Sequence, residues 1–200
     1  PYTTLFRSLA GTLDVPRTID EVLRRIAEAG EDNVWISRTQ EAALREAAVA
    51  LEKRRNEIDR LPLFGIPFAV KDNIDVGGME TTAACPGFAY VAGESADVVK
   101  RLVDAGALMI GKTNLDQFAT GLVGVRSPYG VPANPVRADL IPGGSSSGSA
   151  VAVSAGLVPL ALGTDTAGSG RVPAMLNNIV GLKPSLGLVS TAGVVPACRT

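Results

Sequence analysis

Beyond Pro62 the chain alternates short apolar runs with stretches of helical pattern, and this alternation restricts its fold more than any other feature. Each apolar run is bounded by glycine or proline, which is typical of buried strands. The pattern predicts strands at Ile66–Val70, Ala107–Ile110 and Leu157–Leu162, helices at Asp97–Ala105 and Ala150–Ala155, and a short buried piece at Val180–Leu182. Because strands that alternate with helices form a sheet covered by helices, we predict an α/β fold.

The first 62 residues show helical patterns instead. Thr18–Glu21 has the form of a capping box, which predicts that a helix starts there, and Gly30 is placed to end it. A second, long amphipathic helix is predicted from Gln40 to about Ile58, before Pro62 stops it. The apolar faces are expected to be Val22, Leu23 and Ile26 in the first helix, and Ala43, Ala47, Ala50 and Leu51 in the second.

Composition excludes several classes of function. The chain has no histidine and only two cysteines, Cys85 and Cys198, which rules out a Ser-His-Asp triad within these residues and a metal site of histidine and cysteine, and indicates a reducing compartment. With 19 basic and 20 acidic residues, the net charge of -1 gives no field that attracts nucleic acid. The longest apolar stretch, Ala150–Leu162, is too short and interrupted to span a membrane. We expect a cytoplasmic protein with no metal or other cofactor and no nucleic-acid or membrane partner.

Two loops rich in glycine and serine carry the candidate chemistry. Pro142–Ser149 is Pro-Gly-Gly-Ser-Ser-Ser-Gly-Ser, and Gly163–Pro173 is Gly-Thr-Asp-Thr-Ala-Gly-Ser-Gly-Arg-Val-Pro. Upstream, the apolar run in Gly65–Asp72 ends in Lys71. A serine hydroxyl is a poor nucleophile until a base removes its proton, and a lysine amine is a base only when burial favours its neutral form. The three segments therefore contain the residues for a serine nucleophile activated by lysine.

Each of these segments also has a simpler interpretation. By composition alone, the first loop is typical of a flexible linker, and Lys71 is typical of a lysine paired with Asp72. Gly144–Gly148 also satisfies the G-x-S-x-G elbow with Ser146 at its centre, although the elbow should follow a strand directly and Pro142-Gly-Gly precedes it here. A phosphate-binding loop is excluded, because Ser149 stands where that loop requires lysine.

In order and in spacing, the three segments resemble the amidase signature family. Its members are serine hydrolases that use a Ser-cisSer-Lys triad on an α/β fold with a mixed central sheet flanked by helices. The resemblance runs from about Leu63 to Ala197. It implies that Lys71 is the base, that Ser145 follows a cis peptide bond and passes a proton, and that Ser169 is the nucleophile.

The resemblance also assigns roles to neighbouring residues. It implies an oxyanion hole made by the backbone amides of Thr166, Ala167, Gly168 and Ser169. It implies supporting roles for Ser146, Asp165 and Arg171. Ala167 stands where the family has glycine, so this residue would be strained if the loop required a positive φ there.

Within the family, the allophanate hydrolases are most similar, judged on Asn114–Gly121, Gly163–Ala174 and Gly187–Cys198. That similarity implies hydrolysis of allophanate to ammonia and carbon dioxide in urea degradation, with a functional link to a urea carboxylase. Two alternatives stay open inside the family. One is the glutamine amidase subunit of a tRNA-dependent amidotransferase, and the other is an amidase for another small amide.

For the domain organisation we expect a helical arm at residues 1–62 and the first part of a catalytic core at residues 63–200, truncated at its C-terminus. Residues 1–8 show no clear period and are a candidate for foreign sequence. Since the family's domain is more than twice as long, a catalytically silent fragment is an alternative of a different class. The oligomeric state stays open, with a homodimer among the alternatives.

Overall fold

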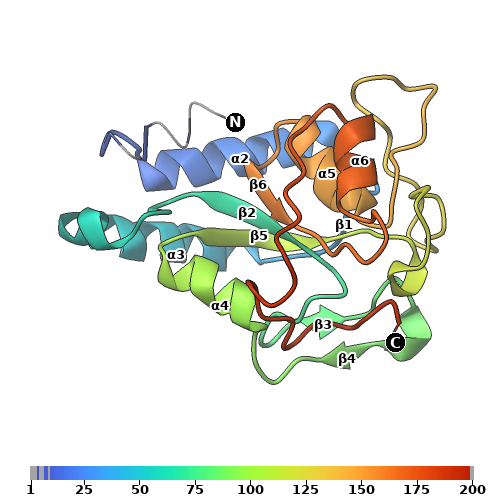
Figure 1. The fold of residues 1–200 in the computed structure, drawn as a ribbon. Helices are drawn as coiled ribbons and strands as arrows, with labels where there is room; N and C mark the ends of the chain where they lie inside the picture. Colours follow the sequence, from blue (N-terminus) through green and yellow to red (C-terminus); the bar gives the residue numbers. More distant parts are fainter. Residues whose placement is uncertain (1–3, 5–6, 9, 199–200) are drawn as a thin grey trace.

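The computed structural model of the 200-residue chain describes residues 4, 7–8 and 10–198 (Figure 1). Its centre is a four-stranded sheet in the order β1-β5-β2-β6, in which β1 is antiparallel to β5 and the other neighbours are parallel. The strands are β1 (Trp35–Arg38), β2 (Pro67–Lys71), β5 (Leu108–Thr113) and β6 (Leu160–Leu162). Helices flank this sheet, so the predicted α/β fold with a mixed central sheet is confirmed.

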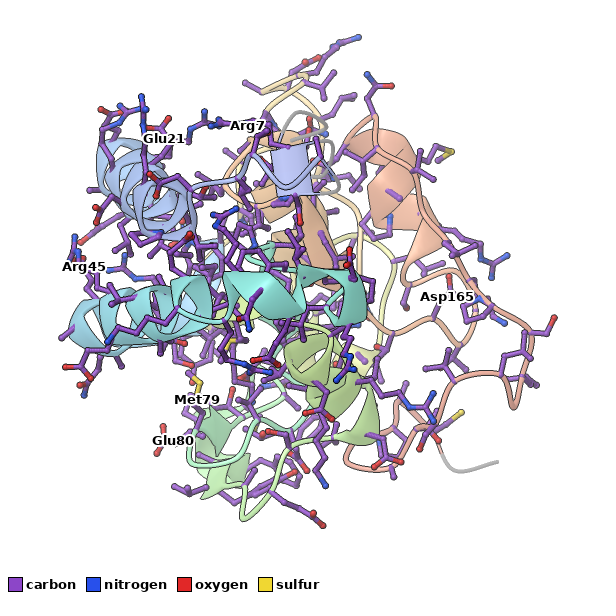
Figure 2. The ribbon with its side chains drawn as sticks, turned by 90° about the vertical axis from the view of Figure 1, so that its left-hand side faces the viewer. Arg7, Glu21, Arg45, Met79, Glu80 and Asp165 are labelled. Carbon is purple, nitrogen blue, oxygen red and sulfur yellow. The ribbon has the colours of Figure 1, made fainter. Side chains whose placement is uncertain are left out.

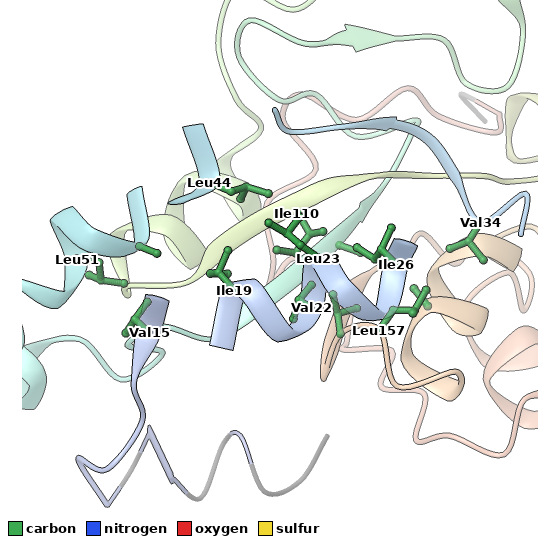
Figure 3. Packing of buried hydrophobic residues seen from close by; sticks show 14 of the residues in the cluster. Val15, Ile19, Val22, Leu23, Ile26, Val34, Leu44, Leu51, Ile110 and Leu157 are labelled. Atoms are coloured by element: carbon green, nitrogen blue, oxygen red, sulfur yellow. The ribbon is translucent and has the colours of Figure 1, made fainter. Parts of the chain in front are cut away.

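Helices lie on both faces of the sheet. Three of them share one face: α2 (Val15–Ala29), α3 (Glu41–Glu52) and α5 (Ser147–Ser154). Their apolar side chains join Ala69 of β2 and Ile110 of β5 in the buried cluster of Figure 3. On the opposite face, Val99 of α4 (Asp97–Asp104) packs in a second cluster with Val70 of β2. Successive side chains of β2 therefore point into different layers, as strand geometry requires.

The remaining elements surround this sandwich. Strands β3 (Glu80–Thr81) and β4 (Tyr90–Val91) form a separate hairpin, and α6 (Arg171–Leu176) follows the second glycine-rich loop. Short 3₁₀ helices occur at Arg55–Arg60, Pro86–Phe88 and Gln117–Ala119. In the part of the chain that the structure describes, every helix is too short or too polar to cross a membrane.

Helix α2 begins earlier than the capping box predicts. Its N-cap is Asp14, whose Oδ1 accepts a hydrogen bond from the backbone N–H of Arg17 at 2.9 Å. Pro16 lies in the first turn, where its fixed φ suits a helix and its missing N–H is not needed. Thr18 is thus inside the helix, and the predicted start there is wrong. The predicted end is confirmed, since Gly30 caps the helix with φ of 67°.

Helix α3 is shorter than predicted and buries a different face. It ends at Glu52, and the chain continues in the 3₁₀ helix Arg55–Arg60. Its buried residues are Leu44, Ala48 and Leu51. Of the expected face only Leu51 is buried, whereas the three alanines at positions 43, 47 and 50 are exposed. Two leucines seven residues apart bury more apolar area than alanines do, and they decide which face turns inward.

The N-terminal region contributes a strand as well as helices. Strand β1 was not expected from the sequence, and it pairs with β5 at the edge of the sheet. The Ser8 hydroxyl donates to the carbonyl of Phe64 at 2.7 Å, so the described part of the first eight residues contacts the core. Residues 1–3 and 5–6 lie outside the described residues.

Several elements in the second half differ from the prediction: α5 begins at Ser147 rather than Ala150, and β6 begins at Leu160 rather than Leu157. Strand β5 continues beyond Ile110 to Thr113, because Gly111 and Lys112 pair with both β2 and β1. The prediction of a short buried segment at Val180–Leu182 is wrong, since Val180 is 85% exposed and Leu182 is 89% exposed. This segment belongs to no sheet and no helix of the described structure.

Candidate active site

Lys71 is the last residue of β2, and its side chain is fully buried. Its Nζ lies 2.7 Å from Ser145 Oγ and 2.7 Å from Thr164 Oγ1, and it donates a hydrogen bond to each hydroxyl. The structure thus brings together two of the three residues of the expected triad. Thr164 was not expected, although it opens the Thr-Asp-Thr sequence of the second glycine-rich loop.

The surroundings of Lys71 favour its neutral form. Burial lowers its pKa to about 7, while the negative charges of Asp116 and Asp165 oppose that shift without cancelling it. The neighbouring carboxylate does not compensate the amine, because Asp72 forms an ion pair with Lys112 at 3.1 Å instead. The simpler interpretation, in which Lys71 pairs with Asp72, is therefore wrong. With a pKa near 7, the amine is uncharged in about half of the molecules at neutral pH, as a general base requires.

The free energy of unfolding of the wild type, relative to a Lys71→Met variant, is expected to rise with pH between about 7 and 10. In this range the folded chain has released the Lys71 proton, whereas the unfolded chain still binds it. Stability rises with pH wherever the unfolded state binds more protons, here by about 1.4 kcal/mol per pH unit. Urea unfolding at a series of pH values measures the difference. A difference that does not change with pH would show that folded Lys71 keeps its proton.

The loop that carries Ser145 is held by the backbone of the buried residue Asp116. The peptide bond between Gly144 and Ser145 is cis, as the resemblance implies. The backbone N–H of Asp116 donates to the Ser145 carbonyl at 3.0 Å, and the carboxylate of Asp116 accepts from the N–H groups of Gly124 and Arg126, each at 2.9 Å. A Cβ on Gly144 would lie 2.1 Å from Asp116 Oδ2, so only glycine fits there. Asp116 was not expected as a site residue, although it lies in the Asn114–Gly121 stretch that carries part of the resemblance.

The second loop is organised around Asp165 (Figure 2). Its carboxylate accepts from the backbone N–H groups of Gly168 at 2.8 Å, Gly170 at 3.1 Å and Arg171 at 3.1 Å. The Arg171 guanidinium adds contacts of 2.9 and 3.0 Å to the same carboxylate. These donors, the guanidinium first, hold the pKa of the Asp165 carboxyl well below its usual range. The structure thus joins Asp165 and Arg171 in the second loop, and their supporting role stays a prediction.

The expected oxyanion hole differs at one position. The N–H of Gly168 donates to Asp165, so it is not available to a substrate oxygen. The N–H groups of Thr166, Ala167 and Ser169 donate to no protein atom among the residues that the structure describes. Gly168 has the positive φ, at 130°, and Ala167 is outside that region of φ, so the expected strain at Ala167 is absent. Three of the four amides remain free to bind an oxyanion.

Ser146 ties the two loops together. Its backbone N–H donates to the Ser169 carbonyl at 3.0 Å. Its hydroxyl donates to the Thr164 carbonyl at 3.2 Å and accepts from the Thr164 N–H at 3.3 Å. A Cβ on Gly163 would lie 2.8 Å from Ser146 Oγ, so the loops are in close contact. This placement agrees with a supporting role for Ser146 and occupies the hydroxyl that the elbow hypothesis would use as a nucleophile.

Ser169 is nearly buried, at 6% exposure, and its hydroxyl lies 3.4 Å from the Gly121 carbonyl. Between Lys71, Ser145 and Ser169 the described residues show one hydrogen bond, the one from Lys71 to Ser145. The structure therefore juxtaposes the two loops but does not join the Ser145 and Ser169 hydroxyls. Residues 142–152 are buried and continue directly into α5, so the alternative of a flexible linker is wrong.

Comparisons with known proteins agree with this geometry. The family model named Amidase matches residues 17–200. A urea amidolyase of Saccharomyces cerevisiae is 54% identical over 184 residues, which are 92% of this chain but 10% of that protein. A glutamyl-tRNA(Gln) amidotransferase subunit of Symbiobacterium thermophilum is 50% identical over 191 residues, 94% of this chain and 39% of that protein.

A solved structure of a related protein has a similar fold. Allophanate hydrolase from Kluyveromyces lactis has a TM-score of 0.81 with this chain at 52% identity, over 90% of this chain and 30% of that one. This chain thus spans less than half the length of each of these relatives. Since the family model covers nearly the whole chain and the fold agrees, the chain belongs to the amidase family.

Proposed function

We propose that this chain holds the reaction centre of an amide hydrolase, in which Ser169 attacks the substrate carbonyl, Ser145 relays a proton and Lys71 receives it. The observation that carries the proposal is the fully buried Lys71 amine, whose pKa near 7 permits a neutral form, 2.7 Å from the Ser145 hydroxyl. Membership of the amidase family supports the same reaction class.

In the proposed first step, the Ser169 hydroxyl gives its proton to Ser145, and Ser145 gives its own proton to Lys71. A hydroxyl can act in this way because it both donates and accepts. Ser169 Oγ forms a bond to the carbonyl carbon while the π electrons move onto the carbonyl oxygen. The step requires the Ser169 hydroxyl to leave the Gly121 carbonyl and turn toward Ser145.

The N–H groups of Thr166, Ala167 and Ser169 are proposed to donate to the resulting oxyanion, because they have no other protein acceptor in the described structure. Collapse of the intermediate breaks the C–N bond, and the proton on Lys71 returns through Ser145 to the leaving nitrogen. Water then releases the acyl group from Ser169 by the same proton path.

For the substrate we propose allophanate, with ammonia and carbon dioxide as the final products. The support is the similarity to a urea amidolyase and to an allophanate hydrolase, at 54% and 52% identity. A urea carboxylase that supplies the substrate follows as the functional partner. Glutamine is the second candidate, because the glutamyl-tRNA(Gln) amidotransferase relative is 50% identical.

The proposal is tested by ammonia release from three substrates, namely allophanate, glutamine and propionamide. We expect kcat/KM to be highest for allophanate, with release abolished in Ser169→Ala. Preference for glutamine would replace allophanate by the second candidate and leave the amidase mechanism standing. No release from any of the three would contradict the proposal and favour the alternative of a catalytically silent chain.

A further inference from the structure

A second buried lysine lies on the strand next to Lys71. Lys112 belongs to β5, which pairs with β2 so that Val70 lies opposite Lys112 and Lys71 lies opposite Thr113. Successive side chains of a strand alternate between the faces of the sheet. Lys112 therefore shares the face of Val70 and of Asp72, two residues further on, whereas Lys71 points into the layer of α5.

Lys112 is held by Asp72, the residue that follows Lys71 in the chain. Its Nζ lies 3.1 Å from Asp72 Oδ1, and both side chains are 0% exposed. The amine also donates to the Glu80 carbonyl and to Thr81 Oγ1, each at 2.7 Å. Glu80 is labelled in Figure 2 at the start of the β3–β4 hairpin. The hairpin thus completes the surroundings of the ion pair.

The carboxylate of Asp72 has further donors of its own. Its Oδ2 accepts from the Thr82 N–H at 2.9 Å and from the Thr82 hydroxyl at 2.5 Å. These two bonds hold the carboxylate in place even without Lys112. Asp72 directly follows Lys71, the last residue of β2, so the position of Asp72 affects the backbone at the end of that strand.

Different carboxylates act on the Lys71 and Lys112 amines. Lys71 faces Asp116, from the segment after β5, and Asp165, from the loop after β6. Lys112 faces Asp72, Asp75 and Glu80. Asp75 is itself bound by the hydroxyls of Thr81 and Tyr90, at 2.8 and 2.7 Å. A third carboxylate near Lys71 without a counter-charge would favour its protonated form.

We propose that Lys112 is a positioning residue for Lys71: it neutralises and anchors Asp72, and so leaves the neighbouring Lys71 amine to the hydroxyls of Ser145 and Thr164. The catalytic importance of Lys112 rests on the proposed function. The effect of Lys112 on the Lys71 amine is a property of the folded chain and does not depend on activity. Among the described residues, Lys112 donates no hydrogen bond to Ser145, to Thr164 or to the second glycine-rich loop.

Three variants test the proposal: Lys112→Met, Asp72→Asn and the two combined. Lys112→Met leaves a negative charge next to Lys71 and is expected to raise the pKa of Lys71 by about one unit. Asp72→Asn leaves a positive charge and is expected to lower it. The double variant has neither charge and is expected to return the pKa of Lys71 to the wild-type value. Replacement of a whole buried ion pair is tolerated far better than removal of one partner, so the double variant is the one most certain to fold.

The pKa of Lys71 is read by NMR titration of chain labelled with ¹³C at lysine Cε, with Lys71→Met to assign the signal. Shifts of the Lys71 pKa in opposite directions in the two single variants support the proposal. The same Lys71 pKa in the wild type and in all three variants overturns it. If Lys112→Met does not fold, the Asp72→Asn shift alone decides. None of these readouts needs turnover, so they stand even if the proposed amidase activity fails.

Kinetics separate positioning from a merely structural role. In Lys112→Met, kcat/KM is expected to fall about fivefold at pH 7 and to recover toward wild type at pH 9, because the acidic limb of the pH profile moves to higher pH. A purely structural loss would lower activity equally at every pH. An equal loss at every pH, with the acidic limb of the pH profile unmoved, would overturn the assignment of Lys112. Inactivity of the wild type would contradict the proposed function instead.

Discussion

Ser169→Ala is expected to lower kcat/KM for ammonia release by a factor of about 10⁴ or more. The variant lacks the oxygen that forms the proposed acyl bond, and no other hydroxyl is placed to replace it. Ser145 Oγ is engaged with Lys71, and Ser146 Oγ is bound on both sides to Thr164. The residual rate should come only from substrate binding and the free backbone amides.

Lys71→Met is expected to have an effect of similar size, because an unactivated serine is a weak nucleophile. Residues that act as one unit are strongly non-additive, so the double variant of Ser169→Ala and Lys71→Met should be no slower than either single variant. Effects that multiply instead would contradict a shared proton path.

Ser147→Ala is the matched control. Ser147 lies in the same loop as Ser145, is 1% exposed, and has a hydroxyl without a hydrogen-bond partner among the described residues. Its replacement removes a buried serine hydroxyl next to the site but breaks no hydrogen bond of the described structure, so kcat/KM should stay within a few-fold of wild type. Loss of activity in Ser147→Ala would mean that the site tolerates no substitution nearby. The loss in Ser169→Ala would then not identify Ser169 as the nucleophile.

Asp165→Ala is expected to lower the free energy of unfolding by about 2 kcal/mol and kcat/KM by about 10²-fold. The carboxylate accepts from three backbone N–H groups of the nucleophile loop, at Gly168, Gly170 and Arg171. Without it these groups lose their acceptor and the loop loses its shape. The Arg171 guanidinium adds little to the stability, because that side chain is 55% exposed. Urea unfolding and ammonia release measure the two effects.

The pH dependence of this stabilisation has a definite sign. The folded-state pKa of Asp165 is held below its unfolded value. Its contribution is therefore present above the unfolded pKa, near 4, and is lost as pH falls below that value. The stability difference between wild type and Asp165→Ala should narrow below about pH 4. A difference that stays constant down to pH 2 would show that the carboxylate is not the source of the effect.

Asp139→Ala provides the comparison for an ordinary ion pair. Asp139 pairs with Arg137, and both side chains are more than 60% exposed. An exposed pair of this kind contributes about 0–1 kcal/mol. A loss at Asp165 that is no larger than the loss at Asp139 would contradict the organising role of Asp165 in the second loop.

The main features of the fold could be predicted from local patterns. The apolar run before Lys71 is strand β2, and the helix predicted at residues 97–105 is α4. Such elements are recognised because their periodicity and their glycine or proline ends lie within a few residues. Strand β1 was missed for the opposite reason, since it has four residues, none of them buried, and is defined by its pairing with β5.

The errors have local physical causes. Thr18 and Asp14 are both reasonable N-caps, and Asp14 caps the helix because the helix extends back over Pro16. The predicted alanine face of α3 was wrong because two leucines bury more apolar area. In both cases the sequence contained the correct residues, but a second local pattern competed with them.

The sequence by itself determined which chemistry is available to this chain: a lysine at the end of an apolar strand, two loops of small residues with several hydroxyls, and no histidine. Only the tertiary structure decided which groups meet. Lys71 and Ser145 are 74 residues apart, and of the two buried lysines only Lys112 forms an ion pair in the described structure. That choice depends on which face of the sheet each side chain occupies and on which loops cover that face. These are long-range packing outcomes, because no local pattern specifies which distant segments lie against each strand.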